Sequence, residues 1–169
     1  MIQIYTDGAC SGNPGAGGVG VVIVQSNEEE KPDIIRQFNI HYENTTNQRM
    51  EISAAIAGLQ EILSTYIIDI DLSDKIIEIH SDSAYLCNAF NMHWIDNWLK
   101  NGWMNSKKQP VANKDLWEKL LSVIEQITPN KVAFYKIKGH NGHIYNELAD
   151  KLAVNAVKNI EVNNENSNN

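Results

Sequence analysis

Four carboxylates of this chain occupy positions where acidic side chains can do chemistry. Asp7 and Asp82 each follow an apolar run typical of a buried strand, Glu51 lies in the first turn of a predicted helix, and Asp150 lies on the last predicted helix. If the two strands are neighbours in one sheet, Asp7 and Asp82 emerge side by side and need a compensating cation. Oxygen ligands without cysteine or paired histidine indicate a hard ion, and Mg²⁺ typically binds through a few carboxylates and substrate phosphate oxygens. Taken singly, each acid fits a helix cap or a solvated surface carboxylate better than a metal ligand.

The residues directly after Asp7 are small and turn-forming, reading GACSGNPG over positions 8–15. Glycine permits positive φ and the close approach of another backbone or of a ligand. The stretch therefore fits a carboxylate placed beside a bulky ligand, and it also fits an ordinary hairpin turn. The remaining acids decide between these interpretations.

The hydrophobic periodicity predicts an α/β fold. Three strand patterns joined by short turns indicate an antiparallel meander, and the later strands are each reached through a helical segment. These features predict a mixed five-stranded sheet, three antiparallel strands followed by parallel strands, with helices packed on it. The predicted strands are 2–5, 19–24, 34–42, 76–80 and 131–138, and the predicted helices are 48–63, a short helix capped by Ser81 or Asp82 and ending at 90, 114–127 and 145–160. Residues 66–75 fit a helix extension or a loop, and we expect residues 161–169 to be a disordered tail.

The composition narrows the class of protein. A chain of 169 residues fits one domain with its own core, which we assign to residues 1–160. The net charge of −7 argues against general nucleic-acid binding, although carboxylates that hold cations make a protein acidic while the cations attract phosphate. No apolar run approaches a membrane span, and Cys10 and Cys87 lack the spacing of a zinc site or a disulfide framework. We expect a cytoplasmic monomer with reduced thiols.

A tryptophan-rich segment separates the third strand-end acid from the last strand. Trp94 and Trp98 are four residues apart and share one helix face, whereas Trp103 and Trp117 fit the core better. Lysines interleave with these aromatic residues, which is a pattern suited to binding a nucleic-acid strand.

Four strings of the sequence together carry a specific resemblance. They are YTDGACSGNPGAGG, TTNQRMEISAA, HSDSAYL and KGHNGHIYNELADKLA, and they occur in this order over nearly the whole chain. In this order they resemble the motifs of bacterial-type ribonuclease H, type 1. The resemblance implies a ribonuclease H fold and endonucleolytic cleavage of the RNA strand of an RNA–DNA hybrid, leaving 5′-phosphate and 3′-hydroxyl ends.

The resemblance also implies roles for individual residues. Asp7, Glu51, Asp82 and Asp150 match the family's metal-binding carboxylates, and His140 matches a mobile loop histidine that assists proton transfer or product departure. Two Mg²⁺ ions roughly 4 Å apart would clamp the scissile phosphate, one activating water and one stabilising the leaving oxygen, and Mn²⁺ is a possible substitute. His140 alone would also fit an ordinary loop histidine, and His143 is expected to hold the loop or the last helix.

Substrate contacts follow from the same motifs. A protein distinguishes RNA from DNA through the 2′-hydroxyl, and the positions that match the family's minor-groove contacts are Asn13, Asn47 and Gln48, with the Cys10 main chain nearby. The DNA strand would lie along Tyr85, Trp94 and Trp98, and Thr46 and Asn113 resemble its phosphate pocket. Lys100, Lys107 and Lys108 match a basic protrusion that Asp96, Met104 and Asn105 make less basic here. We therefore expect weaker substrate affinity and ordinary sensitivity to salt.

Two other functions remain open at this point. An inactivated domain of the same fold would bind hybrids without cleaving them, but it predicts a lost acid or a lost loop histidine. Another nuclease of the wider superfamily would cleave double-stranded DNA as fast as hybrid.

Overall fold

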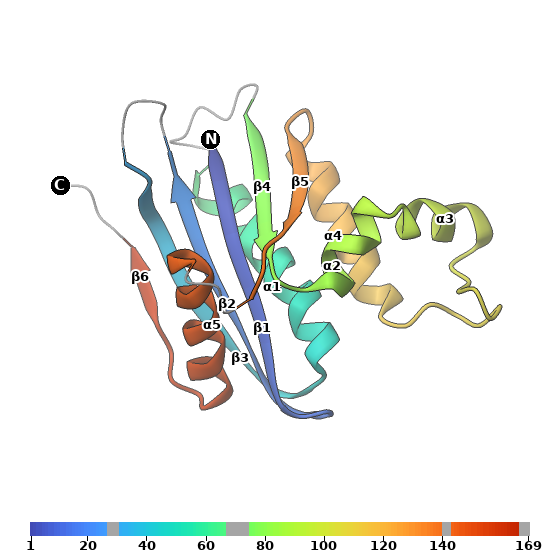
Figure 1. Cartoon of the computed structure of the whole chain (residues 1–169), viewed down its shortest axis with the longest axis horizontal. Helices are drawn as coiled ribbons and strands as arrows, with labels where there is room; N and C mark the ends of the chain where they lie inside the picture. The colour runs from blue at the N-terminus through green and yellow to red at the C-terminus, as the bar shows by residue number, and fades with distance from the viewer. Residues whose placement is uncertain (27–30, 67–74, 140–142, 166–169) are drawn as a thin grey trace.

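One mixed sheet of six strands organises the part of the chain that the structure describes. The structure is a computed structural model that describes residues 1–26, 31–66, 75–139 and 143–165 (Figure 1). The strands are β1 (Ile2–Gly12), β2 (Gly15–Gln25), β3 (Asp33–Thr45), β4 (Ile76–Ser81), β5 (Lys131–Lys136) and β6 (Asn163–Glu165), in the spatial order β5-β4-β1-β2-β3-β6. β1 pairs antiparallel with β2 and β2 with β3, whereas β4 runs parallel to both β1 and β5. The predicted fold class is confirmed, and β6 is an addition to it.

The helices cover the two faces of this sheet. They are α1 (Asn47–Glu61), α2 (Ala84–Asn91), α3 (Trp94–Asn101), α4 (Lys114–Ile127) and α5 (Ile144–Val157), and the π-helical segment Ile62–Tyr66 continues α1. α1 packs between the sheet and α4 in the larger core, which contains Ile4, Ile52 and Trp117, while α5 covers the opposite face over Tyr5 and Val22. α3 lies at one end of the molecule, away from the sheet (Figure 1). Among the described residues, no helix is both long and apolar enough to cross a bilayer.

Glycines on β2 let α5 approach the sheet closely. A Cβ atom at Gly20 would lie 2.1 Å from the backbone oxygen of Ala149, and one at Gly18 would lie 2.4 Å from that of Ala153. Any side chain at these positions would push α5 outward. The glycines of β2 therefore fix the depth of the helix that carries Asp150.

The C-terminal segment differs from the prediction. Residues 163–165 pair antiparallel with β3, so the expectation of disorder is wrong for this part of the tail. The cause is Asn39, a buried side chain of β3 whose Nδ2 donates to the Ile160 oxygen at 2.8 Å and whose Oδ1 accepts from the Val162 backbone N–H at 2.8 Å. These contacts hold the chain beside β3. Residues 166–169 lie outside the described part, as do residues 67–74 of the segment left unassigned between the first helix and β4.

Two details of the helix ends also differ. The cap of α2 is Ser83, whose hydroxyl accepts from the Leu86 backbone N–H at 3.1 Å, so the prediction of Ser81 or Asp82 as the cap is wrong. The Ser81 hydroxyl instead accepts from the Ser83 N–H at 3.1 Å, which tightens the turn. α1 begins at Asn47 with Thr46 as its cap, so Glu51 lies in the second turn and not in the first.

Candidate active site

Three carboxylates from distant parts of the sequence converge at one point. Oxygen atoms of Asp7, Glu51 and Asp82 all lie within 4.8 Å of one another. The register of the parallel pair β1 and β4 explains the first contact, because Tyr5 pairs with His80 and the two aspartates each follow two residues later. The sheet therefore places Asp7 and Asp82 at the same level, as the sequence predicted for neighbouring strands.

Glu51 reaches this point because α1 lies directly against β1. A Cβ atom at Gly8 would lie 2.5 Å from the Glu51 backbone nitrogen, so only glycine allows this approach. The Thr46 side chain caps α1 by accepting from the Arg49 backbone N–H at 3.3 Å. The start of the helix, and with it the position of Glu51, is thereby fixed.

The acids of this cluster lie close together and are buried, and no positively charged side chain is among the groups that shift the pKa values of Asp7 and Glu51. Burial, followed by the charge of Asp82 and by a hydrogen bond with Asp150, raises the pKa of Asp7 from 3.8 to about 8, and only the Gly8 backbone lowers it. Burial and the charges of Asp7 and Asp82 raise the pKa of Glu51 well above its ordinary value. The hydrogen bond with Asp7 also brings Asp150 of α5 to the cluster. All four acids singled out in the sequence thus meet.

The cluster has the properties of a site for a divalent cation. Glu51 Oε2 is buried and has no hydrogen-bond partner among the described residues. An orphaned carboxylate oxygen beside two further acids is costly without a cation and matches the oxygen ligands that Mg²⁺ and Mn²⁺ prefer. Asp7, Glu51, Asp82 and Asp150 therefore form a donor set that fits such an ion.

Gly139, three residues after the end of β5, lies against one side of this cluster. A Cβ atom at Gly139 would lie 2.8 Å from Asp82 Oδ2, so the chain passes directly over that carboxylate. His140 lies outside the described residues, and its role stays a prediction. The His143 ring lies 5.0 Å from the Tyr5 ring, and the His143 backbone oxygen accepts from Glu147 in the first turn of α5. The His143 ring also lies 6.2 Å from the Tyr145 ring of α5, but the side chain makes no cap hydrogen bond to that helix, so the expectation that His143 holds the loop or the last helix stays a prediction.

The residues expected to read the RNA strand gather around the start of α1. The Asn47 backbone N–H donates to Asn13 Oδ1 at 3.2 Å, which ties the glycine-rich turn to the helix. The Cys10 thiol contacts the Thr45 backbone oxygen at 3.4 Å, and Gln48 is exposed on the first turn. Cys10, Asn13, Asn47 and Gln48 are therefore brought to one surface next to Glu51.

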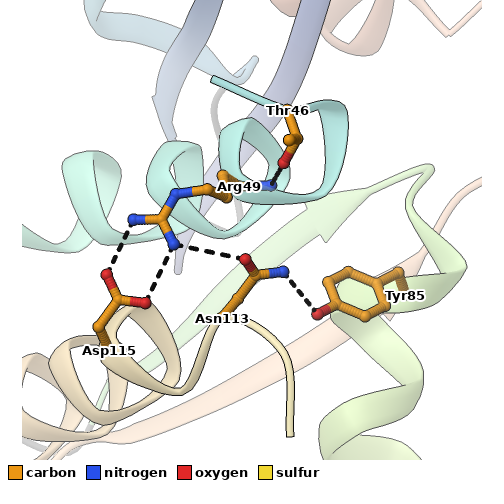
Figure 2. A network of polar contacts seen from close by, with 5 residues as sticks. All are labelled: Thr46, Arg49, Tyr85, Asn113 and Asp115. Atoms are coloured by element: carbon orange, nitrogen blue, oxygen red, sulfur yellow. Dashed lines mark hydrogen bonds and ion pairs between the residues drawn. The ribbon is translucent and has the colours of Figure 1, made fainter. Parts of the chain in front are cut away.

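Three of the residues expected to contact the DNA strand, Thr46, Tyr85 and Asn113, lie close to Arg49 of α1 (Figure 2). Asn113 Nδ2 donates to the Tyr85 hydroxyl at 3.1 Å, and its Oδ1 accepts from Arg49, whose guanidinium also binds Asp115. Sequence reasoning missed Arg49 and Asp115. The signal available for Arg49 was its place inside TNQRME, whereas nothing in the sequence links it to Asp115.

The aromatic segment is continuous with this second group. Trp117 is fully buried, as predicted, and its ring lies 5.3 Å from Tyr85 and 5.7 Å from Trp98. The Trp94 and Trp98 rings are 6.4 Å apart on α3 and both are half-buried, as is Trp103. Lys100, Lys107 and Lys108 are exposed on α3 and on the loop after it.

The fold and the site together define a class of protein. It is an α/β protein in which acids on and beside the central strands form a site suited to divalent cations. Polar groups next to that site suit a ligand that carries phosphates. The RNase H family model matches residues 1–158. The chain is 42% identical over 158 residues to a Ribonuclease H of Caldanaerobacter subterraneus subsp. tengcongensis, covering 94% of this chain and 92% of that one. It is 44% identical over 156 residues to a Ribonuclease H of Symbiobacterium thermophilum, covering 92% and 94% of the two chains. The chain belongs to the ribonuclease H family and is of the bacterial type.

Solved structures agree with this assignment. LC9-RNase H1, described as a type 1 RNase H with the type 2 active-site motif, superposes with a TM-score of 0.77 at 25% identity, covering 96% of this chain and 77% of that one. LC11-RNase H1 in complex with an RNA/DNA hybrid superposes with a TM-score of 0.65 at 25% identity, covering 93% and 99%. The homologues support a nuclease activity for the family.

Proposed function

We propose that this protein is an endoribonuclease that hydrolyses the RNA strand of RNA–DNA hybrids with divalent metal ions and leaves 5′-phosphate and 3′-hydroxyl ends. The observation that carries the proposal is the convergence of Asp7, Glu51 and Asp82, with ligand oxygens within 4.8 Å of one another, in a chain of this family. An inactivated binding domain would have no need to keep buried acids that repel one another.

The four acids hold the metal in this proposal. Asp7, Glu51, Asp82 and Asp150 would bind two ions, Mg²⁺ in the cell and Mn²⁺ as a substitute, which activate the attacking water and stabilise the leaving 3′ oxygen. The orphaned oxygen of Glu51 supports its assignment as a ligand. His140 would assist proton transfer or product departure from the loop that follows Gly139.

Strand selectivity arises from the surface around the start of α1. Asn13, Asn47, Gln48 and the Cys10 main chain would contact the 2′-hydroxyls of the RNA strand, which both donate and accept hydrogen bonds. The DNA strand would pass Thr46, Asn113 and Tyr85 and continue along Trp94 and Trp98. The relative LC11-RNase H1, solved in complex with an RNA/DNA hybrid, supports a hybrid as the substrate.

The test is cleavage of labelled duplexes by the purified protein. We expect a hybrid to be cut in its RNA strand with Mg²⁺, double-stranded RNA and DNA to remain intact, and Asp7→Asn to be inactive. Asp33→Asn is the matched control, because Asp33 is an exposed acid at the start of β3. Undiminished cleavage by Asp7→Asn would refute the site, and equal cleavage of double-stranded DNA would favour a DNA nuclease of the wider superfamily.

We further propose that the protein acts as a cytoplasmic monomer. Cys10 and Cys87 are both free thiols, in keeping with a reducing compartment. Light scattering coupled to size-exclusion chromatography tests the monomer, and a mass of twice 19.0 kDa would refute it.

A further inference from the structure

Arg49 is the centre of the polar network that joins α1 to the start of α4 (Figure 2). Its backbone N–H donates to Thr46 Oγ1 at 3.3 Å, and its Nη1 donates to Asn113 Oδ1 at 3.3 Å. Nη1 and Nη2 also bind the two carboxylate oxygens of Asp115, at 3.0 and 2.8 Å. A single residue therefore contacts both members of the expected phosphate pocket, Thr46 and Asn113.

These contacts fix the direction of each hydrogen bond. Arginine has only donors, so the amide of Asn113 must turn its oxygen to Arg49 and its nitrogen to Tyr85, where Nδ2 donates to the hydroxyl at 3.1 Å. The Tyr85 hydroxyl therefore accepts from Asn113, and the Thr46 hydroxyl accepts from the Arg49 backbone. The O–H groups of Thr46 and Tyr85 and the second N–H of Asn113 are left to donate to a ligand.

A cluster of three donors from three elements suits a ligand that only accepts. A phosphate of a nucleic-acid backbone is such a ligand, since its non-bridging oxygens accept hydrogen bonds and carry negative charge. Without Arg49, the Asn113 amide could rotate and present its oxygen to the phosphate. The orientation that Arg49 imposes on the Asn113 amide thus decides whether this site attracts or repels a phosphate.

Two further observations indicate that the orientation of Asn113 is held against alternatives. Asn113 is the residue before α4 and has φ 61°, but its side chain makes no cap hydrogen bond to the helix. Asparagine is a preferred N-cap, so the amide gives up a common local contact for the network. Asp115 holds the Arg49 guanidinium in a bidentate ion pair, although the two side chains are 66% and 35% exposed.

We propose that Arg49, held by Asp115, is the positioning residue that turns Thr46, Asn113 and Tyr85 into a donor-only site for one phosphate of the DNA strand. The proposal rests on the proposed function, because it deepens the recognition of the hybrid. Arg49 lies two residues before Glu51 on α1, so the same helix sets the phosphate site and a metal ligand. The bond that is cut in the RNA strand then lies at a fixed distance from the DNA phosphate that this site holds.

The experiment replaces single DNA-strand phosphates of a labelled hybrid with neutral methylphosphonates, one position at a time. Cleavage is measured as kcat and KM for the wild type, Arg49→Ala, Arg49→Lys and Asn113→Asp. Glu118→Gln is the matched control, since Glu118 is an exposed acid of α4 that pairs with Lys114 and lies outside the network. Circular dichroism melts check folding, and Asn113→Asp keeps an acceptor for Arg49 in place.

We expect one phosphate position to cost the wild type roughly tenfold in kcat/KM when neutralised, the loss of about one hydrogen bond to a charged group. Arg49→Ala should raise KM by a similar factor with little change in kcat, and neutralising the same phosphate should then cost it almost nothing more. Arg49→Lys should resemble Arg49→Ala, because an ammonium group cannot hold a carboxylate and an amide in one plane. Asn113→Asp should lose the same phosphate contact, and Glu118→Gln should behave as wild type.

Two results would overturn the proposal. One is a phosphate penalty in Arg49→Ala equal to that of the wild type, which would leave Arg49 a structural residue only. The other is wild-type behaviour of Arg49→Lys, which would reduce its role to charge. Binding of the same hybrids by fluorescence anisotropy, with each substitution placed on the non-cleaving Asp7→Asn background, separates this test from the proposed function. A protein that binds with the predicted coupling but does not cleave would refute only the function, and one that neither binds nor cleaves hybrids would refute both.

Discussion

Replacing Asp7 with Asn is expected to stabilise the metal-free protein at neutral pH while it abolishes cleavage. Asp7 is buried among other acids, and this environment raises its pKa from 3.8 to about 8. The amide of Asn cannot ionise, so it occupies the same volume without bringing a charge into the cluster. Stability and activity therefore oppose each other at this residue.

The sign of the pH dependence follows from the raised pKa. The folded protein keeps the Asp7 proton up to about pH 8, whereas the unfolded chain releases it near pH 3.8. The folded state is thus favoured most below pH 3.8 and loses this advantage progressively as the pH rises to about 8. Asp7→Asn should not lose this stability, so the difference in free energy of unfolding between the variant and the wild type should grow from pH 3.8 to about pH 8.

The magnitude is a few kcal/mol. A tenfold change in a proton-binding constant is worth about 1.4 kcal/mol, so a pKa displaced from 3.8 to about 8 corresponds to at most about 6 kcal/mol. Asp82 and Glu51 share the repulsion and relax when one acid is neutralised, so we expect about 2–5 kcal/mol at pH 8. For a domain of this size, that raises the melting temperature by roughly 5–20 °C.

The assay is thermal unfolding by circular dichroism in EDTA between pH 4 and pH 9. The wild type, Asp7→Asn and the exposed control Asp33→Asn are compared at each pH. Saturating Mg²⁺ should restore much of the lost stability of the wild type at high pH, because an ion that binds only the folded state stabilises it by mass action. It should do less for Asp7→Asn.

A difference between wild type and Asp7→Asn that stays constant across this pH range would refute the reasoning. So would a variant that is less stable than the wild type at pH 8. Either result would mean that the acids of the cluster are not crowded without a counter-charge in the metal-free protein.

Three further substitutions test the packing that positions the site. Gly139→Ala places a Cβ atom 2.8 Å from Asp82 Oδ2, so we expect roughly a 10- to 100-fold loss of kcat with a nearly unchanged melting temperature, measured by cleavage and calorimetry. Gly20→Ala places a Cβ atom 2.1 Å from the Ala149 backbone oxygen and should push α5 outward. We expect urea unfolding to show a loss of about 3 kcal/mol in the free energy of unfolding. Unchanged stability would contradict the close packing of α5. Asn39→Ala leaves the Leu152 and Ile160 oxygens and the Val162 N–H without their partner, and should cost about 2–3 kcal/mol and expose the C-terminal segment to proteolysis, which protection equal to wild type would refute.

Most of the fold was predictable because its elements have strong local patterns. The strand from Val19 to Val24 and the helix from Lys114 to Ile127 carry clear hydrophobic periodicity, and both are present. The neighbouring positions of Asp7 and Asp82 followed from placing two parallel strands side by side. Local pattern and topology agree at these positions, so sequence reasoning succeeds there.

The features that could not be predicted depend on tertiary contacts. β6 is made of Asn163, Asn164 and Glu165, which have low strand propensity, and its pairing depends on hydrogen bonds to Asn39 more than a hundred residues earlier. Arg49 and Asp115 are 66 residues apart, and each alone reads as an ordinary surface charge. Sequence patterns describe the periodicity of an element and contain no record of which side chains meet across elements.

Helix α1 explains why the proposed metal and substrate sites hold a constant relation to each other. The backbone of Asn47 contacts Asn13 of the glycine-rich turn and that of Glu51 lies against Gly8 of β1, whereas the side chain of Arg49, two residues from each, binds Asp115 of α4. The rise of an α-helix is 1.5 Å per residue, so these three side chains are separated by only about 3–6 Å along the axis. Under the proposed assignments, one rigid helix carries an RNA contact, a metal ligand and the residue that orients the DNA phosphate site. The distance between the phosphate that is held and the bond that is cut is then set by helix geometry, and loop conformation has little influence on it.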